Sequence, residues 1–178
     1  KHVSEQNTSS ALTSIWSAAC STGEEAYSIA MVLDSYCKQP WRLIATDVNK
    51  TVIEHARRGI YVDERTSFIP QEFKKKYCRK GINEFQGYLR IAPQLRDRVS
   101  FNVFNLLHNI KDKNHFDVIF LRNVMIYFDD DTKMSLINKI WAALKPNGLL
   151  IVGHSESLFG ISERFNALKP SIYKRIEV

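Results

Sequence analysis

Apolar segments of strand length alternate with helical patterns along most of this 178-residue chain, and that alternation restricts the fold more than any other feature. Five such apolar segments lie at residues 9–19, 41–46, 99–104, 116–121 and 149–153. Helical patterns follow three of them and end near residue 37, at Gly59 and near residue 144. Strands that alternate with helices are typical of a parallel sheet with helices on both faces. The sequence therefore predicts an α/β fold with a doubly wound, mostly parallel sheet.

Two segments depart from this rhythm. Residues 60–98 contain a helical pattern at 71–80 and a strand-like piece at 87–91, so we expect a small β-containing insertion on the α/β core. Near the end of the chain, apolar and polar residues alternate at 164–168 and again at 171–176, with a Lys-Pro pair between the two runs. This pattern predicts a closing antiparallel hairpin.

Length and composition fit one globular domain, which we expect at residues 13–178 behind a polar tail at residues 1–12. No apolar run approaches the roughly 18 residues of a membrane span, and the first ten residues lack the layout of a secretory signal. Three scattered cysteines without a CxxC pair predict neither a disulfide framework nor a zinc or other metal site, and they favour a cytoplasmic protein. The net charge of +6 permits an acidic partner.

In doubly wound sheets, ligands bind beyond the carboxyl ends of the strands, so the loops after the strands carry the functional information. The loop after the first strand holds a single glycine, Gly23, and lacks the GxGxxG pattern of dinucleotide-binding folds. A carboxylate here repels a pyrophosphate but attracts the α-ammonium group of a methionine-like ligand, which favours S-adenosylmethionine (SAM) over NAD. Alternatively, Thr22 and Glu25 form a helix capping box. The loop alone leaves both interpretations open.

The loops after the second and third strands add two further candidates. Asp47 follows the second strand, where an acidic side chain can accept hydrogen bonds from both hydroxyl groups of a ribose. Its alternative role is to cap the helix that starts near Val48. After the third strand, Asn105 and Leu106 offer an amide and an apolar wall to an adenine ring, although an asparagine suits any loop.

The loop after the fourth strand contains an arginine and a tyrosine. Arg122 and Tyr127 lie where they can meet a substrate carboxylate, while the alternative is a structural ion pair and an aromatic core residue. The acidic run that begins at Asp129 is expected to cap the next helix and not to bind a metal. No arrangement of serine, histidine and aspartate for nucleophilic catalysis is apparent from residue order.

These segments together resemble one family, the chemotaxis receptor protein-glutamate O-methyltransferases, or CheR family. The resemblance covers most of the chain in the family's order, and its most specific motifs are SAACSTGEEAYS in the first loop and LRNVMIYFD in the fourth. The matching stretches are residues 15–31, 45–49, 104–107, 116–129 and 144–158. The resemblance implies a class I methyltransferase (Rossmann-like) sheet that binds SAM and releases S-adenosylhomocysteine.

The resemblance also implies roles for the cofactor-binding residues. Glu25 would hold the methionine amino group, and Asp47 the ribose. Asn105 and Leu106 would contact the adenine region. Each of these positions follows from matching the family's motifs to this sequence, residue by residue.

For the reaction, the resemblance implies that Arg122 and Asn123 line the cofactor and substrate pocket and that Tyr127 lies near the transferred methyl group. The substrates would be glutamate side chains on the cytoplasmic helices of chemoreceptors, with no nucleic acid and no membrane insertion. A glutamate with a pKa near 4.3 is already ionised at neutral pH, so it needs no general base before it attacks the methyl group. Positioning and exclusion of water must then supply most of the catalysis.

One family feature has no match here. Family members carry an N-terminal helical domain and a linking segment with a Phe-Phe-Arg motif, and nothing in residues 1–12 matches that motif. This departure motivates an alternative function, a non-catalytic module that binds SAM or S-adenosylhomocysteine. A nucleic-acid methyltransferase is a third hypothesis, but the Asp/Asn-Pro-Pro-aromatic motif expected for it is replaced by Arg122-Asn123-Val124.

Overall fold

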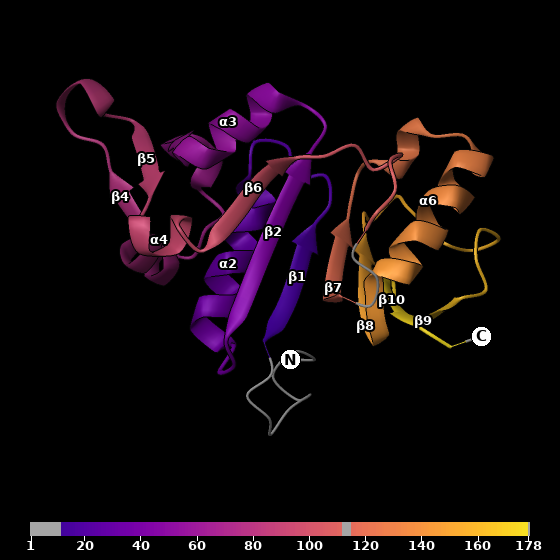
Figure 1. The fold of residues 1–178 in the computed structure, drawn as a ribbon. Coiled ribbons are helices and arrows are strands. Elements are labelled where there is room, and N and C mark those ends of the chain that lie inside the picture. Colours follow the sequence, from indigo (N-terminus) through magenta and orange to yellow (C-terminus); the bar gives the residue numbers. More distant parts are fainter. Residues whose placement is uncertain (1–11, 112–114, 178) are drawn as a thin grey trace.

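A seven-stranded sheet in the order β6-β2-β1-β7-β8-β10-β9 forms the centre of the molecule (Figure 1). The computed structural model describes residues 12–111 and 115–177, so most of the predicted polar tail lies outside the described residues. The strands of the sheet are β1 (Thr13–Ser17), β2 (Trp41–Asp47), β6 (Val99–Val103), β7 (Phe116–Leu121), β8 (Leu144–Val152), β9 (Phe165–Lys169) and β10 (Ile172–Arg175).

The strand directions match the prediction from sequence. Strands β6, β2, β1, β7 and β8 pair in parallel, while β10 is antiparallel to both β8 and β9. In the centre of the sheet Ile15 pairs with Leu43 on one side and with Val118 on the other. The predicted doubly wound, mostly parallel sheet with a closing antiparallel hairpin is therefore confirmed.

Neighbouring residues of each central strand pack against opposite layers of helices. Ile15 belongs to a core cluster with helices α2 (Glu24–Tyr36) and α3 (Lys50–Arg58), whereas Trp16 belongs to a second cluster with helix α6 (Asp130–Ala143). Figure 1 shows α6 on the side of the sheet opposite α2. Because side chains alternate along a strand, a sheet covered on both faces needs apolar residues at successive strand positions, as at Ile15 and Trp16.

The insertion forms a second sheet of three short antiparallel strands in the order β3-β5-β4. Its elements are β3 (Ile60–Val62), the 3₁₀ turns η1 (Asp63–Thr66) and η2 (Asn83–Phe85), α4 (Gln71–Tyr77), β4 (Cys78–Lys80), β5 (Tyr88–Ile91) and α5 (Pro93–Arg96). The predicted helix at 71–80 is three residues too long. Cys78 is buried and its strand pairs with β5, so tertiary packing ends the helix early.

The insertion shares its apolar core with the main sheet. Tyr61, Tyr77, Leu89 and Ile91 are buried in the same cluster as helix α2. A hydrogen bond adds to this packing. Asp34 of α2 accepts it from the Tyr77 hydroxyl at 2.8 Å. The insertion is thus fixed against the edge of the main domain.

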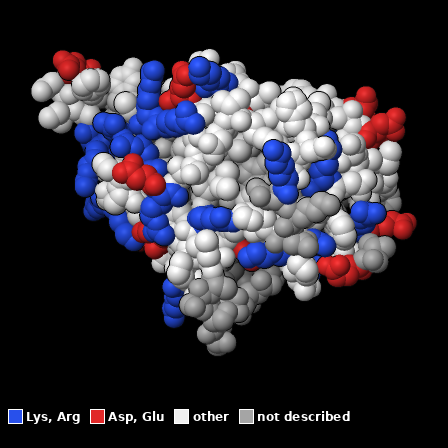
Figure 2. Space-filling model, viewed as in Figure 1, with Lys and Arg blue, Asp and Glu red and all other residues white. Residues whose placement is uncertain are grey.

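The outer surface of the insertion is strongly basic. Residues 60–98 contain nine basic and five acidic residues, so they carry four of the six net positive charges of the chain. Figure 2 shows Lys and Arg side chains gathered on the side of the molecule where Figure 1 places α4, β4 and β5. Arg79 and Arg90 lie directly opposite each other on β4 and β5, and both are exposed. Like charges in that position destabilise a sheet, so this surface is suited to an anionic partner.

Two local predictions need correction. The Lys-Pro-Asn-Gly sequence at residues 145–148 is typical of a turn, but it lies within β8, where the register against β7 slips between Phe116 and Val118 and Asn147 takes a left-handed conformation with φ 62°. On α6, the three-residue spacing of Met134 and Ile137 predicts that both lie on one buried face, but Met134 is 41% exposed. No helix in the described part of the chain is long and apolar enough to cross a membrane.

The packing of α6 gives a direct test of this fold. Ile137 is fully buried against the sheet, so we expect Ile137→Ala to lower the free energy of unfolding by about 2–5 kcal/mol, through lost burial and the cavity left behind. On the same helix, Met134→Ala should cost less than about 1 kcal/mol because that side chain is largely solvated. Urea denaturation followed by circular dichroism measures both values; equal costs would contradict the described orientation of α6.

Candidate functional site

The loops after β1, β2, β6 and β7 meet at one edge of the sheet, because these four strands run in parallel. Backbone hydrogen bonds join neighbouring loops. The Cys20 N–H donates to the Thr46 carbonyl and the Phe104 N–H to the Asp47 carbonyl, each at 2.9 Å. All the candidate residues identified from sequence lie at the end of one of these strands, in the loop that follows it, or at the start of the next helix. The edge therefore forms one continuous, braced surface.

The first loop depends on Gly23. This residue has φ +95°, and a Cβ built on it would lie 2.8 Å from the Cβ of Ala56. The Tyr61 hydroxyl of the insertion donates to the Thr22 carbonyl at 2.8 Å and holds the loop from the other side. Gly23 is the residue before α2, which has no side-chain cap, and the Thr22 hydroxyl contacts Glu24. The capping box considered as an alternative for Thr22 and Glu25 is therefore wrong.

Glu25 lies at the junction of three elements. Its Oε1 accepts a hydrogen bond from the Ser17 hydroxyl at 2.8 Å, and its Oε2 accepts one from Arg122 at 2.9 Å. The side chains of Glu25 and Arg122 are 20% and 35% exposed, so this ion pair is partly shielded from solvent. The contact joins residues that are 97 positions apart in the sequence. Glu25 is thus fixed at the start of α2 with its carboxylate toward the edge of the sheet.

Asp47 connects the first loop to the second. One oxygen of its carboxylate accepts from the Ser21 N–H at 2.9 Å, and the other accepts from the Asn49 N–H at 3.0 Å. The N-cap of α3 is Asn49, whose own side chain accepts from the Thr51 N–H. Asp47 is therefore not the helix cap that the sequence allowed as an alternative. Its side chain remains partly exposed at the edge of the sheet.

The Asn105 and Leu106 side chains in the third loop are less available to a ligand than the sequence implied. The Asn105 side chain accepts from the Leu107 N–H at 2.9 Å and so stabilises its own turn. Leu106 is 7% exposed and packs in the core cluster that contains Trp16. Its neighbour Leu107 is 46% exposed. Any contact that Leu106 makes with a ligand would therefore involve mainly its backbone.

The fourth loop carries the remaining candidates. Asn123 has a left-handed conformation with φ 57°, and the short 3₁₀ turn η3 (Met125–Tyr127) follows it. Tyr127 is 78% exposed at the rim of the edge and does not contribute to the core. The structural alternative of an aromatic core residue is wrong for Tyr127, whereas Arg122 does form an ion pair.

Sequence analysis missed Glu156, which follows β8. It is 8% exposed, and its carboxylate accepts hydrogen bonds from backbone N–H groups of the fourth loop, including that of Asn123 at 2.8 Å. The sequence signal was its place in the loop after the last parallel strand. Order alone does not show that a side chain turns back to bind a neighbouring loop.

A family model described as the SAM-binding domain of CheR methyltransferase matches residues 1–174. The chain belongs to this family. It is 39% identical to a chemotaxis protein methyltransferase of Escherichia coli over 163 residues, which cover 89% of this chain and 57% of that protein. It is 38% identical to chemotaxis protein methyltransferase 2 of Pseudomonas aeruginosa, over 89% of this chain and 58% of the relative. The chain thus spans a little over half the length of these relatives.

Solved structures support the fold of this CheR family domain. A TehB-like SAM-dependent methyltransferase from Corynebacterium glutamicum matches with a TM-score of 0.52 and 16% identity, over 92% of this chain and 78% of that one. At that identity the likeness concerns the fold alone. It confirms the class I methyltransferase architecture inferred from sequence.

An apolar groove of about 890 Å³ extends from the Glu25–Arg122 pair along one face of the sheet. Three of its polar residues, Glu25, Arg122 and His154, follow the carboxyl ends of strands, while α2 and the β9–β10 hairpin form the walls and add Ser28, Lys169 and Ser171. The apolar lining includes Ile29, Val32, Leu33, Ile151, Leu168 and Ile172. A mostly apolar groove with a few polar groups is typical of a small-molecule site.

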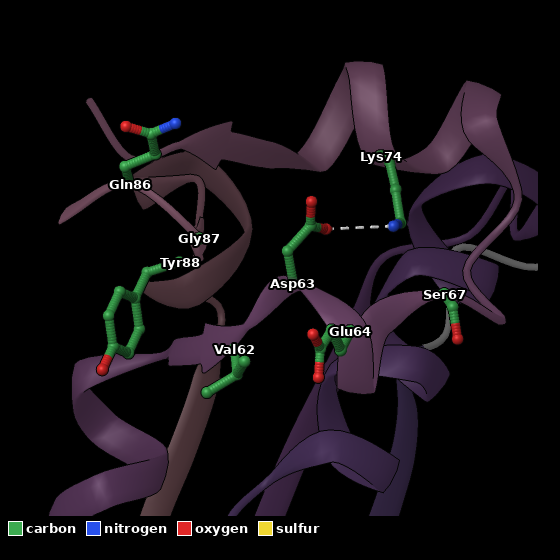
Figure 3. Close-up of a pocket in the computed structure, with 8 residues that line it drawn as sticks. All are labelled: Val62, Asp63, Glu64, Ser67, Lys74, Gln86, Gly87 and Tyr88. Carbon is green, nitrogen blue, oxygen red and sulfur yellow. Dashed lines mark hydrogen bonds and ion pairs between the residues drawn. The ribbon is translucent and has the colours of Figure 1, made fainter. Parts of the chain in front are cut away.

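A second hollow, of about 560 Å³, lies in the insertion between η1 and the turn that precedes β5 (Figure 3). Its principal contact is an ion pair of 3.2 Å between Asp63 and Lys74. The Thr66 hydroxyl and the Lys74 ammonium lower the pKa of Asp63. This carboxylate is thus already paired, and the strand-end edge is the better candidate site. Within residues 12–111 and 115–177, no three His, Cys, Asp or Glu side chains gather as a metal site.

The packing of the first loop predicts low thiol reactivity. Burial, and then the Asp47 carboxylate, raise the pKa of Cys20 to about 12. Only the thiolate reacts, and at pH 8 it is about one ten-thousandth of the Cys20 population. Iodoacetamide at pH 8, followed by mass spectrometry, should therefore modify the partly exposed Cys37 well before Cys20. Modification of Cys20 in the folded protein as fast as in urea would contradict the packing described for this loop.

Proposed function

We propose that this chain binds SAM and forms the cofactor-binding part of a protein-glutamate O-methyltransferase that acts on chemoreceptors. One observation carries the proposal: the strand-end loops bring Glu25, Asp47 and Arg122 to one edge of a class I methyltransferase sheet. Family membership agrees with it, since the matching model is a SAM-binding domain. We propose residues 13–178 as this domain, with the insertion at about 60–98.

The donor set fits the chemistry of SAM. Glu25 offers a partly shielded carboxylate to the α-ammonium group, a contact strengthened by the low solvent access. Asp47 offers a carboxylate to the ribose hydroxyls, next to a first loop whose Gly23 allows close approach. Asn105 and the backbone of Leu106 would bound the adenine, and Asn123 would line the pocket shared by cofactor and substrate.

Arg122 and Tyr127 would serve the substrate in different ways. The ion pair with Glu25 keeps the Arg122 guanidinium on the cofactor side of the site. Arg122 would therefore not form a bidentate contact with the substrate glutamate, which would weaken that carboxylate as a nucleophile. Tyr127, exposed at the rim, would orient the incoming glutamate carboxylate. When bound, SAM would supply an electrophilic methyl group to a glutamate oxygen, and the electron pair of the broken carbon–sulfur bond would remain on the sulfur of S-adenosylhomocysteine. The residues of this chain contribute positioning and exclusion of water, and no proton transfer.

We propose the cytoplasmic domains of chemoreceptors as the protein substrates, and the cytoplasm as the compartment. The relatives in Escherichia coli and Pseudomonas aeruginosa are named chemotaxis protein methyltransferases, which supports this substrate class. The basic surface of residues 60–98 also suits a partner rich in glutamates.

The test of function uses the complete gene product, receptor-containing membranes and SAM with a radiolabelled methyl group. We expect label to enter the receptor as a methyl ester that alkali releases. Calorimetry should show binding of both SAM and S-adenosylhomocysteine. Binding without any alkali-labile label would refute the enzyme and favour a non-catalytic module, while absence of binding would refute the whole proposal.

The ribose contact gives a sharper test. Asp47→Asn keeps the size of the side chain but removes its charge, so we expect the SAM dissociation constant to rise about tenfold or more. Glu54→Gln, an exposed change on the neighbouring helix α3, is the matched control and should leave binding unchanged. Calorimetry measures both variants, with circular dichroism as a check on folding. Unaltered affinity in a folded Asp47→Asn variant would overturn the ribose assignment.

A further inference from the structure

We propose that Glu156 is a positioning residue for methyl transfer, which fixes the loop that carries Asn123 and Tyr127 through hydrogen bonds to its backbone. The inference rests on the proposed function, since it concerns the same site. None of the contacts involved includes a cofactor or a substrate, so the arrangement is a property of the folded chain alone.

Four backbone N–H groups converge on the Glu156 carboxylate. Its Oε1 accepts from Val124 at 3.0 Å and from Met125 at 2.9 Å. Its Oε2 accepts from Asn123 at 2.8 Å and from Gly153 at 2.7 Å. An ionised carboxylate offers about four acceptor positions and no donor, so this side chain is fully satisfied by the four groups.

The surroundings are shaped to admit this carboxylate. The left-handed conformation of Asn123, with φ 57°, turns three successive N–H groups toward one point, an arrangement that binds anions elsewhere in proteins. At Gly153 a Cβ would lie only 2.6 Å from Oε2 of Glu156, so any side chain there would displace the carboxylate. Glu156 itself is 8% exposed, which strengthens each hydrogen bond relative to one in water.

The groups held by Glu156 are not part of the sheet. Asn123, Val124 and Met125 follow the end of β7, and Gly153 follows the end of β8. The loop between Arg122 and Tyr127 is therefore fixed from its centre, while Arg122 is fixed separately by Glu25. The cofactor contacts proposed for Glu25 and Asp47 come from loops that Glu156 does not touch. Loss of Glu156 should thus affect the substrate side of the site more than cofactor binding.

Glu156→Gln provides the primary test. The amide has nearly the same shape, but its NH₂ group meets N–H donors that the carboxylate oxygen accepted, so the loop must move. A displacement of about 1 Å can lower a rate by about 100-fold, and we expect that loss in kcat for receptor methylation. The SAM dissociation constant should rise by less than about tenfold, which is 1.4 kcal/mol. Glu163→Gln, an exposed change later in the same loop, should alter neither value.

Gly153→Ala is the second variant, and it disturbs the same contact from the other side without changing any charge. It should likewise lower kcat by much more than it weakens SAM binding. If Glu156→Gln lowers the folded fraction, the result for Gly153→Ala tests the proposal instead. In both variants the amide resonances of residues 123–125 should shift in nitrogen–proton correlation spectra, while amides of the central strands keep their positions.

The outcomes separate the two proposals. A kcat near that of the unaltered protein in both folded variants would overturn the positioning role. So would an equal loss of kcat and cofactor binding that follows the folded fraction, because that result indicates stability alone. If the unaltered complete protein neither binds SAM nor methylates receptors, the proposed function fails, and the inference about Glu156 fails with it.

Discussion

The parallel pairing of five neighbouring strands is the constraint on which the rest of this structure depends. It places the carboxyl ends of β6, β2, β1, β7 and β8 at one edge, so residues that are far apart in sequence become neighbours there. Backbone hydrogen bonds such as that from Cys20 to Thr46 continue the pairing beyond the strands and into the loops. The loops that surround the proposed site are thus extensions of a rigid sheet.

Two carboxylates are held at this edge in contrasting ways. Glu25 contacts a cationic side chain and a hydroxyl group and keeps part of its surface open. Glu156 is enclosed by backbone N–H groups, which leave it no acceptor position for a ligand. The first arrangement suits a residue that must still bind a cation, and the second suits one that only maintains geometry. The difference in their partners is therefore the reason why we propose a ligand contact for Glu25 and a supporting role for Glu156.

Sequence patterns predicted the sheet and both layers of helices, and they selected candidate residues that the fold brings to one edge of the sheet. Alternating strands and helices determine parallel pairing, and Asp47 and Glu25 were found because ligands bind where such strands end. Sequence patterns do not predict side-chain contacts between distant loops. The four hydrogen bonds of Glu156 are an example, because they depend on the left-handed turn at Asn123. Helix α4 ends early for a similar reason, because pairing of Cys78 with β5 outweighs a local helical preference. The assignments of individual residues to cofactor and substrate remain predictions.

The insertion has a consequence for how this domain can be divided. Tyr61 comes from the first strand of the insertion, yet its ring lies in the core of the main domain and its hydroxyl holds the Thr22 carbonyl of the first loop. Removing residues 60–98 would therefore expose apolar surface on α2 and release one side of the Gly23 turn. The small sheet is not a module that can be exchanged freely between proteins, because Tyr61 from this sheet helps to hold the loop that contains Gly23.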